Sequence, residues 1–343
     1  MKKILFVFGF AALAAMTTVS FTSCTKEGPA GKDGEAGING TDGTATCIQC
    51  HDNTEELFAK QNQWAASTHA TGGNYARSTV GCADCHTSQG FREAMATGQP
   101  VANDISNANP INCYTCHEIH KTYTPTDWAL TTVAPVTLML NGASVDFGTG
   151  NLCANCHQSR PIDAAVMPVV GGPDIILTAA NKRYGSHHGP QANIIGGIGK
   201  GLYEIGTGYM NSAHTSLEKG CVTCHLSDGY GNQGGGHVMN VKYGTSYVTS
   251  GCTEAGCHDA TAVKQEILDY QAEIQTLLDQ IKAKLVEAGI ANEGDLYTKP
   301  GTYSADVVGA FLNHQSVTED KSLGVHNPRY VKKLLENSLA ALN

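Results

Sequence analysis

Five short segments of the chain share the pattern Cys-x-x-Cys-His, and these residue types at this spacing suit one particular chemistry. Two thiols separated by two residues can both add to the vinyl groups of one haem, and the adjoining histidine can then bind the iron as its proximal ligand. The segments are CIQCH (47–51), CADCH (82–86), CYTCH (113–117), CANCH (153–157) and CVTCH (221–225). The pattern predicts covalent attachment of haem c.

Zinc ribbons and disulfides are the alternative uses of paired cysteines, because Cys-x-x-Cys occurs in both. Neither requires a histidine after each second cysteine, and histidine makes up only 14 of 343 residues, so we favour haem. The predicted attachment residues are Cys47, Cys50, Cys82, Cys85, Cys113, Cys116, Cys153, Cys156, Cys221 and Cys224. The predicted proximal ligands are His51, His86, His117, His157 and His225.

The segment GCTEAGCHDA (251–260) holds the same residue types with a wider gap between the cysteines. Of the 13 cysteines, ten belong to the five motifs and Cys24 ends the N-terminal apolar segment, which leaves Cys252 and Cys257. His258 follows Cys257 as a histidine follows every other second cysteine, so we expect a sixth haem with His258 as its proximal ligand. A disulfide between Cys252 and Cys257 is the alternative, because a short loop can be closed.

Distal ligands are the next requirement, because a six-coordinate haem iron needs a second axial ligand. Eight histidines remain after the proximal ones, and six would be used. We expect these to be His69, His120, one of His187 and His188, His214, His237 and His326, and we leave out His314, which lies in an expected helix. His120 is too close in sequence to His117 to reach the opposite face of the same iron, so we expect it to serve another haem.

The N-terminus has the features of an export signal. Lys2 and Lys3 precede an apolar stretch at 4–16 that is too short to span a membrane, and FTSC ends it at Cys24. We predict a lipoprotein signal peptide at 1–23, lipidation of Cys24 and an outer-membrane location, with an ordinary secretory signal as the alternative. Haem c is attached outside the cytoplasm, which agrees with export.

The segment that follows, residues 24–46, is predicted to be a spacer. It places glycine at every third position from 28 to 43, which is the collagen period. A flexible polar linker and a trimerising collagen-like stalk are both compatible with so few triplets.

Two further regions are predicted from composition and periodicity. Residues 47–260 are rich in glycine, asparagine, serine and threonine, so we expect a mainly α multihaem cytochrome c domain with extensive loops, little or no β-sheet and the haems as core. Residues 261–343 are predicted to be helical, with helices at 261–288, at 304–317 and from Asn327-Pro328 onward. This region would supply a distal ligand and either pack on the haem domain or form a homo-oligomer interface.

Several segments resemble those of multihaem c-type cytochromes, a group that includes pentahaem nitrite reductases and octahaem hydroxylamine-oxidoreductase-like enzymes. The similar segments are WAASTHA (64–70), RYGSHHGPQAN (183–193), MNSAHTSLEKGCVTCH (210–225), GGGHVMN (234–240) and EDKSLGVHNPRYVKKLLENS (319–338). The resemblance implies that His69, His214, His237 and His326 are distal ligands. The chain departs from the nitrite reductases because it has no Cys-x-x-Cys-Lys motif.

An electron carrier with about six bis-histidine haems is the function we favour, working in respiratory or extracellular electron transfer at the cell envelope. A formal charge of −9 favours basic redox proteins or an extracellular acceptor as partners and argues against nucleic acid. A reductase of a small nitrogen or sulfur compound is the alternative, with Arg160, Arg183, Tyr184 and the spare member of His187/His188 beside an open haem. A third possible function is that of a haem-storage protein or a structural filament subunit.

Replacing both Cys252 and Cys257 with serine tests the wide motif. If the segment carries a haem, the variant loses one of six haem equivalents per chain in a pyridine haemochrome assay. An unchanged haem count would instead indicate a disulfide.

Overall fold

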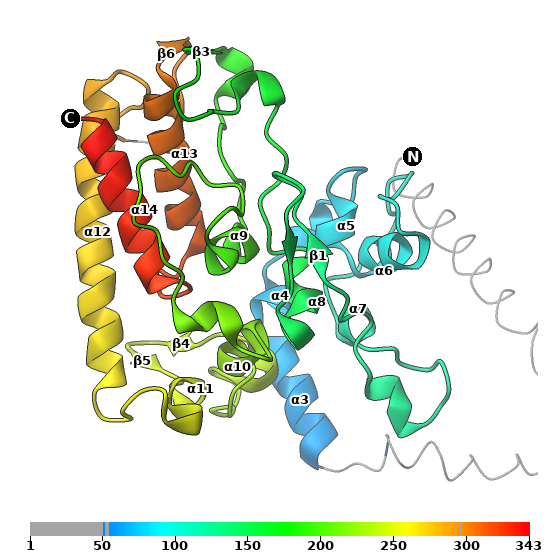
Figure 1. Cartoon of the computed structure of the whole chain (residues 1–343). Coiled ribbons are helices and arrows are strands. Elements are labelled where there is room, and N and C mark those ends of the chain that lie inside the picture. Colours follow the sequence, from blue (N-terminus) through cyan, green and yellow to red (C-terminus); the bar gives the residue numbers. More distant parts are fainter. Residues whose placement is uncertain (1–50, 52–54, 295–296) are drawn as a thin grey trace, which may run out of the picture. The chain divides into compact units, whose positions relative to one another are not determined.

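Helices and long loops make up nearly all of the described chain (Figure 1). The computed structural model describes residues 51, 55–294 and 297–343. The predicted signal peptide, Cys24, the spacer, and the first-motif cysteines Cys47 and Cys50 lie outside these residues. The domain boundaries at 47 and 260 stay predictions.

The longer helices lie at the two ends of the described chain and the short ones between them. The α-helices are α3 (Glu55–Ala66), α4 (Thr68–Thr71), α5 (Ala83–His86), α6 (Ser88–Thr97), α7 (Cys113–Cys116), α8 (Asn151–Ala154), α9 (Gln191–Gly196), α10 (Cys221–His225), α11 (Ser250–Thr253), α12 (Val263–Glu287), α13 (Ala305–Asp320) and α14 (Pro328–Ala341). The 3₁₀ helices are η1 (Asn74–Ala76), η2 (Pro125–Trp128), η3 (Gly148–Gly150), η4 (Ala164–Val166), η5 (Ala179–Asn181), η6 (Ala213–Ser216), η7 (Gly236–Val238) and η8 (Glu254–Gly256).

The β-structure of the described residues is limited to three two-stranded antiparallel pairs. The strands are β1 (Val136–Thr137), β2 (Ser144–Val145), β3 (Ile175–Leu177), β4 (Lys242–Tyr243), β5 (Ser246–Tyr247) and β6 (Gly301–Tyr303). Strand β3 pairs with β6 in the register Ile175 opposite Tyr303, which ties the middle of the chain to its C-terminal region.

Each described attachment motif lies on or beside a helix of about one turn, namely α5, α7, α8, α10 and α11. Helix α7 shows how such a short helix is stabilised. The Asn112 side chain accepts from the backbone N–H of Tyr114, and the Thr115 side chain accepts from the backbone N–H of Asn112. This reciprocal capping satisfies backbone groups that a one-turn helix leaves without partners.

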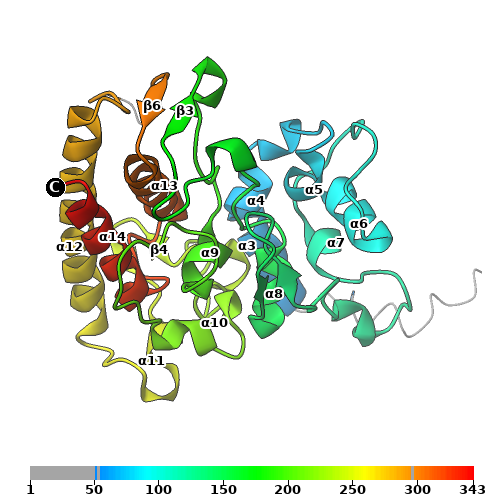
Figure 2. The same cartoon turned by 45° about the horizontal axis from the view of Figure 1, so that its top comes forward.

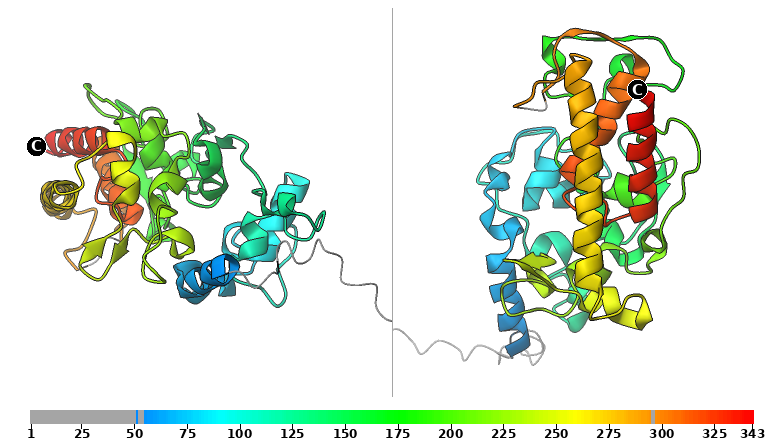
Figure 3. Two further views of the ribbon diagram at one scale, coloured as in Figure 1. Left: turned by 90° about the horizontal axis from the view of Figure 1, so that it is seen from below. Right: turned by 90° about the vertical axis from the view of Figure 1, so that its left-hand side faces the viewer.

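The three C-terminal helices form where the sequence predicts them. Helix α12 covers Val263–Glu287, α13 begins after Ser304 and α14 has Pro328 at its first turn. The Ser304 hydroxyl caps α13 by accepting from the backbone N–H of Val307. Figures 1 and 2, and the right-hand view in Figure 3, show α12, α13 and α14 side by side.

These helices share one apolar core with the middle of the chain. Ile274, Phe311 and Leu334 are buried from α12, α13 and α14, and Leu177 and Ile194 join them from β3 and α9. The C-terminal region therefore packs on the rest of the chain. A second apolar cluster surrounds β1, β2 and α8 and includes Leu138 and Phe147. None of the helices in the described part is long and apolar enough to cross a membrane.

A Leu334→Ala variant tests the C-terminal core. Leu334 is fully buried, so its truncation is expected to lower the free energy of unfolding by about 2–5 kcal/mol. The matched control is Leu268→Ala on the exposed face of α12, where Leu268 is 39% exposed and the expected loss is within about 0.5 kcal/mol. Denaturant unfolding of the holoprotein followed by circular dichroism measures both, and equal losses would contradict this packing.

Candidate haem sites

Six pairs of histidine rings each join one motif histidine to one histidine from elsewhere in the chain. The ring centres are 6.1 Å apart in His51–His120, His69–His157, His214–His258 and His225–His326, and 6.4 Å apart in His86–His187 and His117–His237. The six predicted proximal histidines each have such a partner. The structure thus brings together residues that lie far apart in sequence.

The spacing within the pairs fits two imidazoles on opposite sides of one metal. A ring nitrogen binds a metal at roughly 2 Å, which leaves the centres of two opposed rings about 6 Å apart. The described residues contain no group of three or more His, Cys, Asp or Glu side chains that could hold an ion. A haem iron takes its other ligands from the macrocycle and needs only axial ligands from the protein. The donor set therefore fits haem.

The motif residues line a single large cavity of about 2120 Å³. A drug-sized ligand usually occupies 300–1,000 Å³, so this volume suits a group of bound molecules rather than one. Its lining includes all ten described motif cysteines together with five motif histidines, and it also includes distal candidates such as His69, His214 and His326.

Burial keeps most of the paired imidazoles in the neutral form that binds metals. Desolvation, together with the charge of His157, lowers the pKa of His69 to about 4. Burial, followed by the nearby Arg160, His188, His86 and Arg77 charges, lowers that of His187 to about 4. Burial is also the largest cause that lowers the pKa values of His86, His157, His214, His225 and His237.

Hydrogen bonds at Nδ1 orient many of these rings and leave Nε2 for a metal, as is usual for ligand histidines. The His117 Nδ1–H donates to the Trp128 carbonyl at 2.7 Å, and the His214 Nδ1–H donates to the Val325 carbonyl at 2.8 Å. The Nδ1 atoms of His157, His120 and His258 contact the Gln191 amide oxygen, the Tyr114 hydroxyl and the Glu266 carboxylate, respectively.

Two residues outside the motifs contact the paired rings, and one of them, Met239, joins two pairs. The Met239 carbonyl accepts from His225 Nδ1 at 2.7 Å, while its sulfur lies 3.2 Å from His69 Nδ1. The Asp320 carboxylate contacts His326 Nδ1 at 2.6 Å. Neither residue has a sequence signal of its own, apart from lying in the GGGHVMN and EDKSLGVHNP segments.

Contacts between cysteines place four attachment segments in series. The Cys85 and Cys156 thiols lie close together, which places the second motif beside the fourth. The Cys153 thiol contacts Cys221 in the fifth motif, and Cys224 contacts Cys252 in the wide motif. The order along this series is therefore 82–86, 153–157, 221–225 and 252–258.

Glycine permits the closest of these approaches. A Cβ atom at Gly251 would lie 2.1 Å from the Thr223 carbonyl oxygen and 3.1 Å from Cys224 Cα, so any side chain there would separate α11 from α10. At Gly150, a Cβ atom would lie 2.8 Å from the backbone nitrogen of Cys221. Both glycines stand where one attachment segment meets the next.

The wide motif accommodates its extra residues in a 3₁₀ turn. Cys252 lies in α11, Glu254–Gly256 form η8, and Gly256 has a positive φ of 73° before Cys257. Cys252 and Cys257 are free thiols, and no disulfide joins them. Because His258 also faces His214, this segment has the same parts as the regular motifs.

The adjacent histidines at 187 and 188 have different partners. His187 faces His86, and its φ of 64° is a strained, left-handed conformation of the kind that occurs at functional sites. His188 instead contacts the Glu319 carboxylate through Nδ1 at 2.8 Å. His314, which we left out, is buried in α13 and pairs with no motif histidine.

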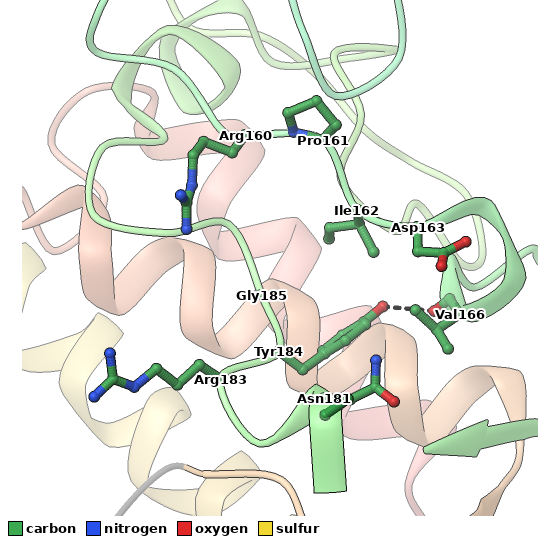
Figure 4. A pocket seen from close by; sticks show the side chains of 10 residues that line it. Arg160, Pro161, Ile162, Asp163, Val166, Asn181, Arg183, Tyr184 and Gly185 are labelled. Carbon is green, nitrogen blue, oxygen red and sulfur yellow. Dashed lines mark hydrogen bonds between the residues drawn. The ribbon is translucent and has the colours of Figure 1, made fainter. Parts of the chain in front are cut away.

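The residues proposed for an open catalytic haem do lie together. Arg160, Arg183 and Tyr184 line a smaller cavity of about 350 Å³ (Figure 4). Figure 4 shows the two arginines on one side of the loop and the Tyr184 ring turned to the other, where its hydroxyl donates to the Val166 carbonyl at 2.9 Å. The Tyr184 hydroxyl therefore already has a hydrogen-bond partner. The nearby motif histidine, His86, likewise already has a partner ring in His187.

Comparison with known proteins places the fold. No protein-family model matches the sequence, and no curated protein matches it. The crystal structure of the outer cell wall cytochrome OcwA matches with a TM-score of 0.53 at 19% identity, over 83% of this chain and 50% of that one. An undecahaem cytochrome from the S-layer of Carboxydothermus ferrireducens gives a TM-score of 0.46 at 18% identity, over 81% of this chain and 40% of that one.

The chain therefore has a cytochrome fold, and it spans half the length of OcwA. The predicted fold class, a mainly α multihaem cytochrome with extensive loops and very little sheet, is confirmed.

A His237→Ala variant tests the pairing of the rings. If this pair holds a haem, removing the imidazole that faces His117 is expected to convert that haem to a high-spin form that binds carbon monoxide. His188→Ala is the matched control, because that ring contacts Glu319 and faces no motif histidine across a 6 Å gap. Resonance Raman and carbon monoxide difference spectra distinguish the two variants, and identical spectra would refute the assignment.

Proposed function

We propose that this chain is a multihaem c-type cytochrome that carries electrons through about six covalently bound haems with histidine on both sides of each iron. The single observation that supports this most directly is the pairing of all six motif histidines with a second ring at 6.1–6.4 Å. When bound, haem c supplies an iron that takes up and releases one electron at a time.

The protein's own residues would hold that group rigidly and keep reactants from it. The paired cysteines of each motif would hold the group through two thioethers, and the two imidazoles of each pair would bind its iron. A small molecule then has no free position at the metal, which favours a carrier over an enzyme. Rigid ligation also reduces the structural change on oxidation and reduction, which suits rapid electron transfer.

The series of attachment segments supports transfer along a chain of sites. Four segments touch through their cysteines, and the remaining two are connected through shared ligands. His120 from the third motif's neighbourhood faces His51 of the first motif, and His237 from beyond the fifth faces His117 of the third. Neighbouring sites of this kind can exchange electrons without any movement of the chain.

The N-terminal segment and the net charge of the chain bear on its location and its partners. The apolar N-terminus and Cys24 support export and lipid anchoring, and OcwA, the protein of similar fold, is described as an outer cell wall cytochrome. We propose an envelope lipoprotein that exchanges electrons with redox proteins or an extracellular acceptor. The net charge of −9, to which haem propionates would add, favours basic partner surfaces.

Spectroscopy of the purified holoprotein tests the carrier function. We expect six haem equivalents, low-spin iron throughout, uptake of about six electrons in a reductive titration, and no spectral change with nitrite or hydroxylamine. The His237→Ala variant, with one axial position opened, is the positive control for ligand binding. A high-spin haem in the wild-type protein that binds either compound would favour a reductase. Fractionation is expected to find the protein with membranes and to find Cys24→Ser released from them.

A further inference from the structure

The His225–His326 pair differs from the other pairs in the group that forms a hydrogen bond with Nδ1 of one of its rings. His326 Nδ1 lies 2.6 Å from a carboxylate oxygen of Asp320, whose side chain is fully buried. Asp320 is the last residue of α13, and the segment that follows returns to place His326 against it. The contact is therefore a short, charge-assisted hydrogen bond away from water.

The other rings of the six pairs that have an Nδ1 partner have weaker acceptors. Backbone carbonyls, an amide oxygen, a hydroxyl and a thioether serve five of the sites, and all of these groups are neutral. The exception is His258, which contacts Glu266 at 3.3 Å, but the Glu266 side chain is 56% exposed. Solvent screens that charge, whereas the charge of Asp320 acts in a low-dielectric interior.

Neighbouring groups fix the Asp320 carboxylate without neutralising it. The Ser322 hydroxyl donates to its second oxygen, and the adjacent Lys321 ammonium pairs with Glu319. Among the ion pairs of the described residues, Asp320 takes part only in the one with His326. The negative charge is thus directed at one imidazole.

The hydrogen bond with Asp320 uses Nδ1 of His326 and leaves Nε2 for a metal. A carboxylate that accepts a ligand's Nδ1–H makes that ligand a stronger electron donor, and a stronger donor stabilises the oxidised metal.

We propose that Asp320 makes the haem held by His225 and His326 the one with the lowest reduction potential in the chain. The inference rests on the proposed function, because it needs a haem at this pair. Reduction of that iron adds one electron from an external reductant and moves no proton, so the carboxylate acts by charge alone. Since 221–225 lies between 153–157 and 252–258 in the series, this residue would create an interior energy step that divides the carriers into two groups.

An Asp320→Asn variant tests the proposal. The amide oxygen can still accept from Nδ1, so ligation is retained while the charge is lost. We expect the lowest of the six midpoints to rise by about 59 mV, which is a tenfold change in the equilibrium constant for one electron. Spectroelectrochemical titration of the holoprotein measures all six midpoints. Glu266→Gln is the matched control, and its exposed carboxylate is expected to give a several-fold smaller shift.

The haem count and low-spin spectrum of the same samples test the proposed function separately from the inference. If Asp320→Asn keeps six low-spin haems and no midpoint rises, or if the midpoint that rises is not the lowest, the proposal is wrong. If the variant loses a haem or becomes high-spin, the midpoints of a Ser322→Ala variant test the role of Asp320 instead. Loss of the hydroxyl strengthens the carboxylate as an acceptor, so the lowest midpoint should fall, and an unchanged midpoint would refute the role of Asp320.

Discussion

The pairing of imidazoles from distant parts of the chain, with ring centres 6.1–6.4 Å apart, is the constraint on which the rest of this structure depends. A Cys-x-x-Cys-His motif supplies one ring of a pair locally, but the second must come from another part of the chain. In the six pairs the second ring comes from segments as different as α4, for His69, and the loop between α13 and α14, for His326. Long-range ligand contacts therefore take much of the role that an aliphatic core has in other proteins.

This constraint explains why the two parts of the described chain differ in their helices and their packing. Segments that carry motifs are short helices joined by loops, because each needs to offer only a few side chains to the cavity. The C-terminal helices, in contrast, bury Ile274, Phe311 and Leu334 in a conventional apolar core. That core fixes the end of α13, and with it Asp320 and the loop that carries His326, so packing among the C-terminal helices positions two groups of the candidate site.

Local chemistry made much of this predictable from sequence. The motif histidines, the three C-terminal helices and the set of candidate second ligands follow from spacing, periodicity and a count of the remaining histidines. The pairing itself does not, because no local rule connects His69 to His157 or chooses between His187 and His188. The Nδ1 partners of the rings could not be predicted either, since Met239 reaches His69 only when distant segments meet and Asp320 reaches His326 only through the turn after α13.

The ring from the loop before α14 has a consequence for the order in which the molecule can be completed. His326 follows its partner His225 only after the long helices α12 and α13. A chain made from its N-terminus therefore contains the fifth attachment segment well before the second ring of its pair. Any truncation that removes α14 and the loop before it would leave His225 without its partner ring.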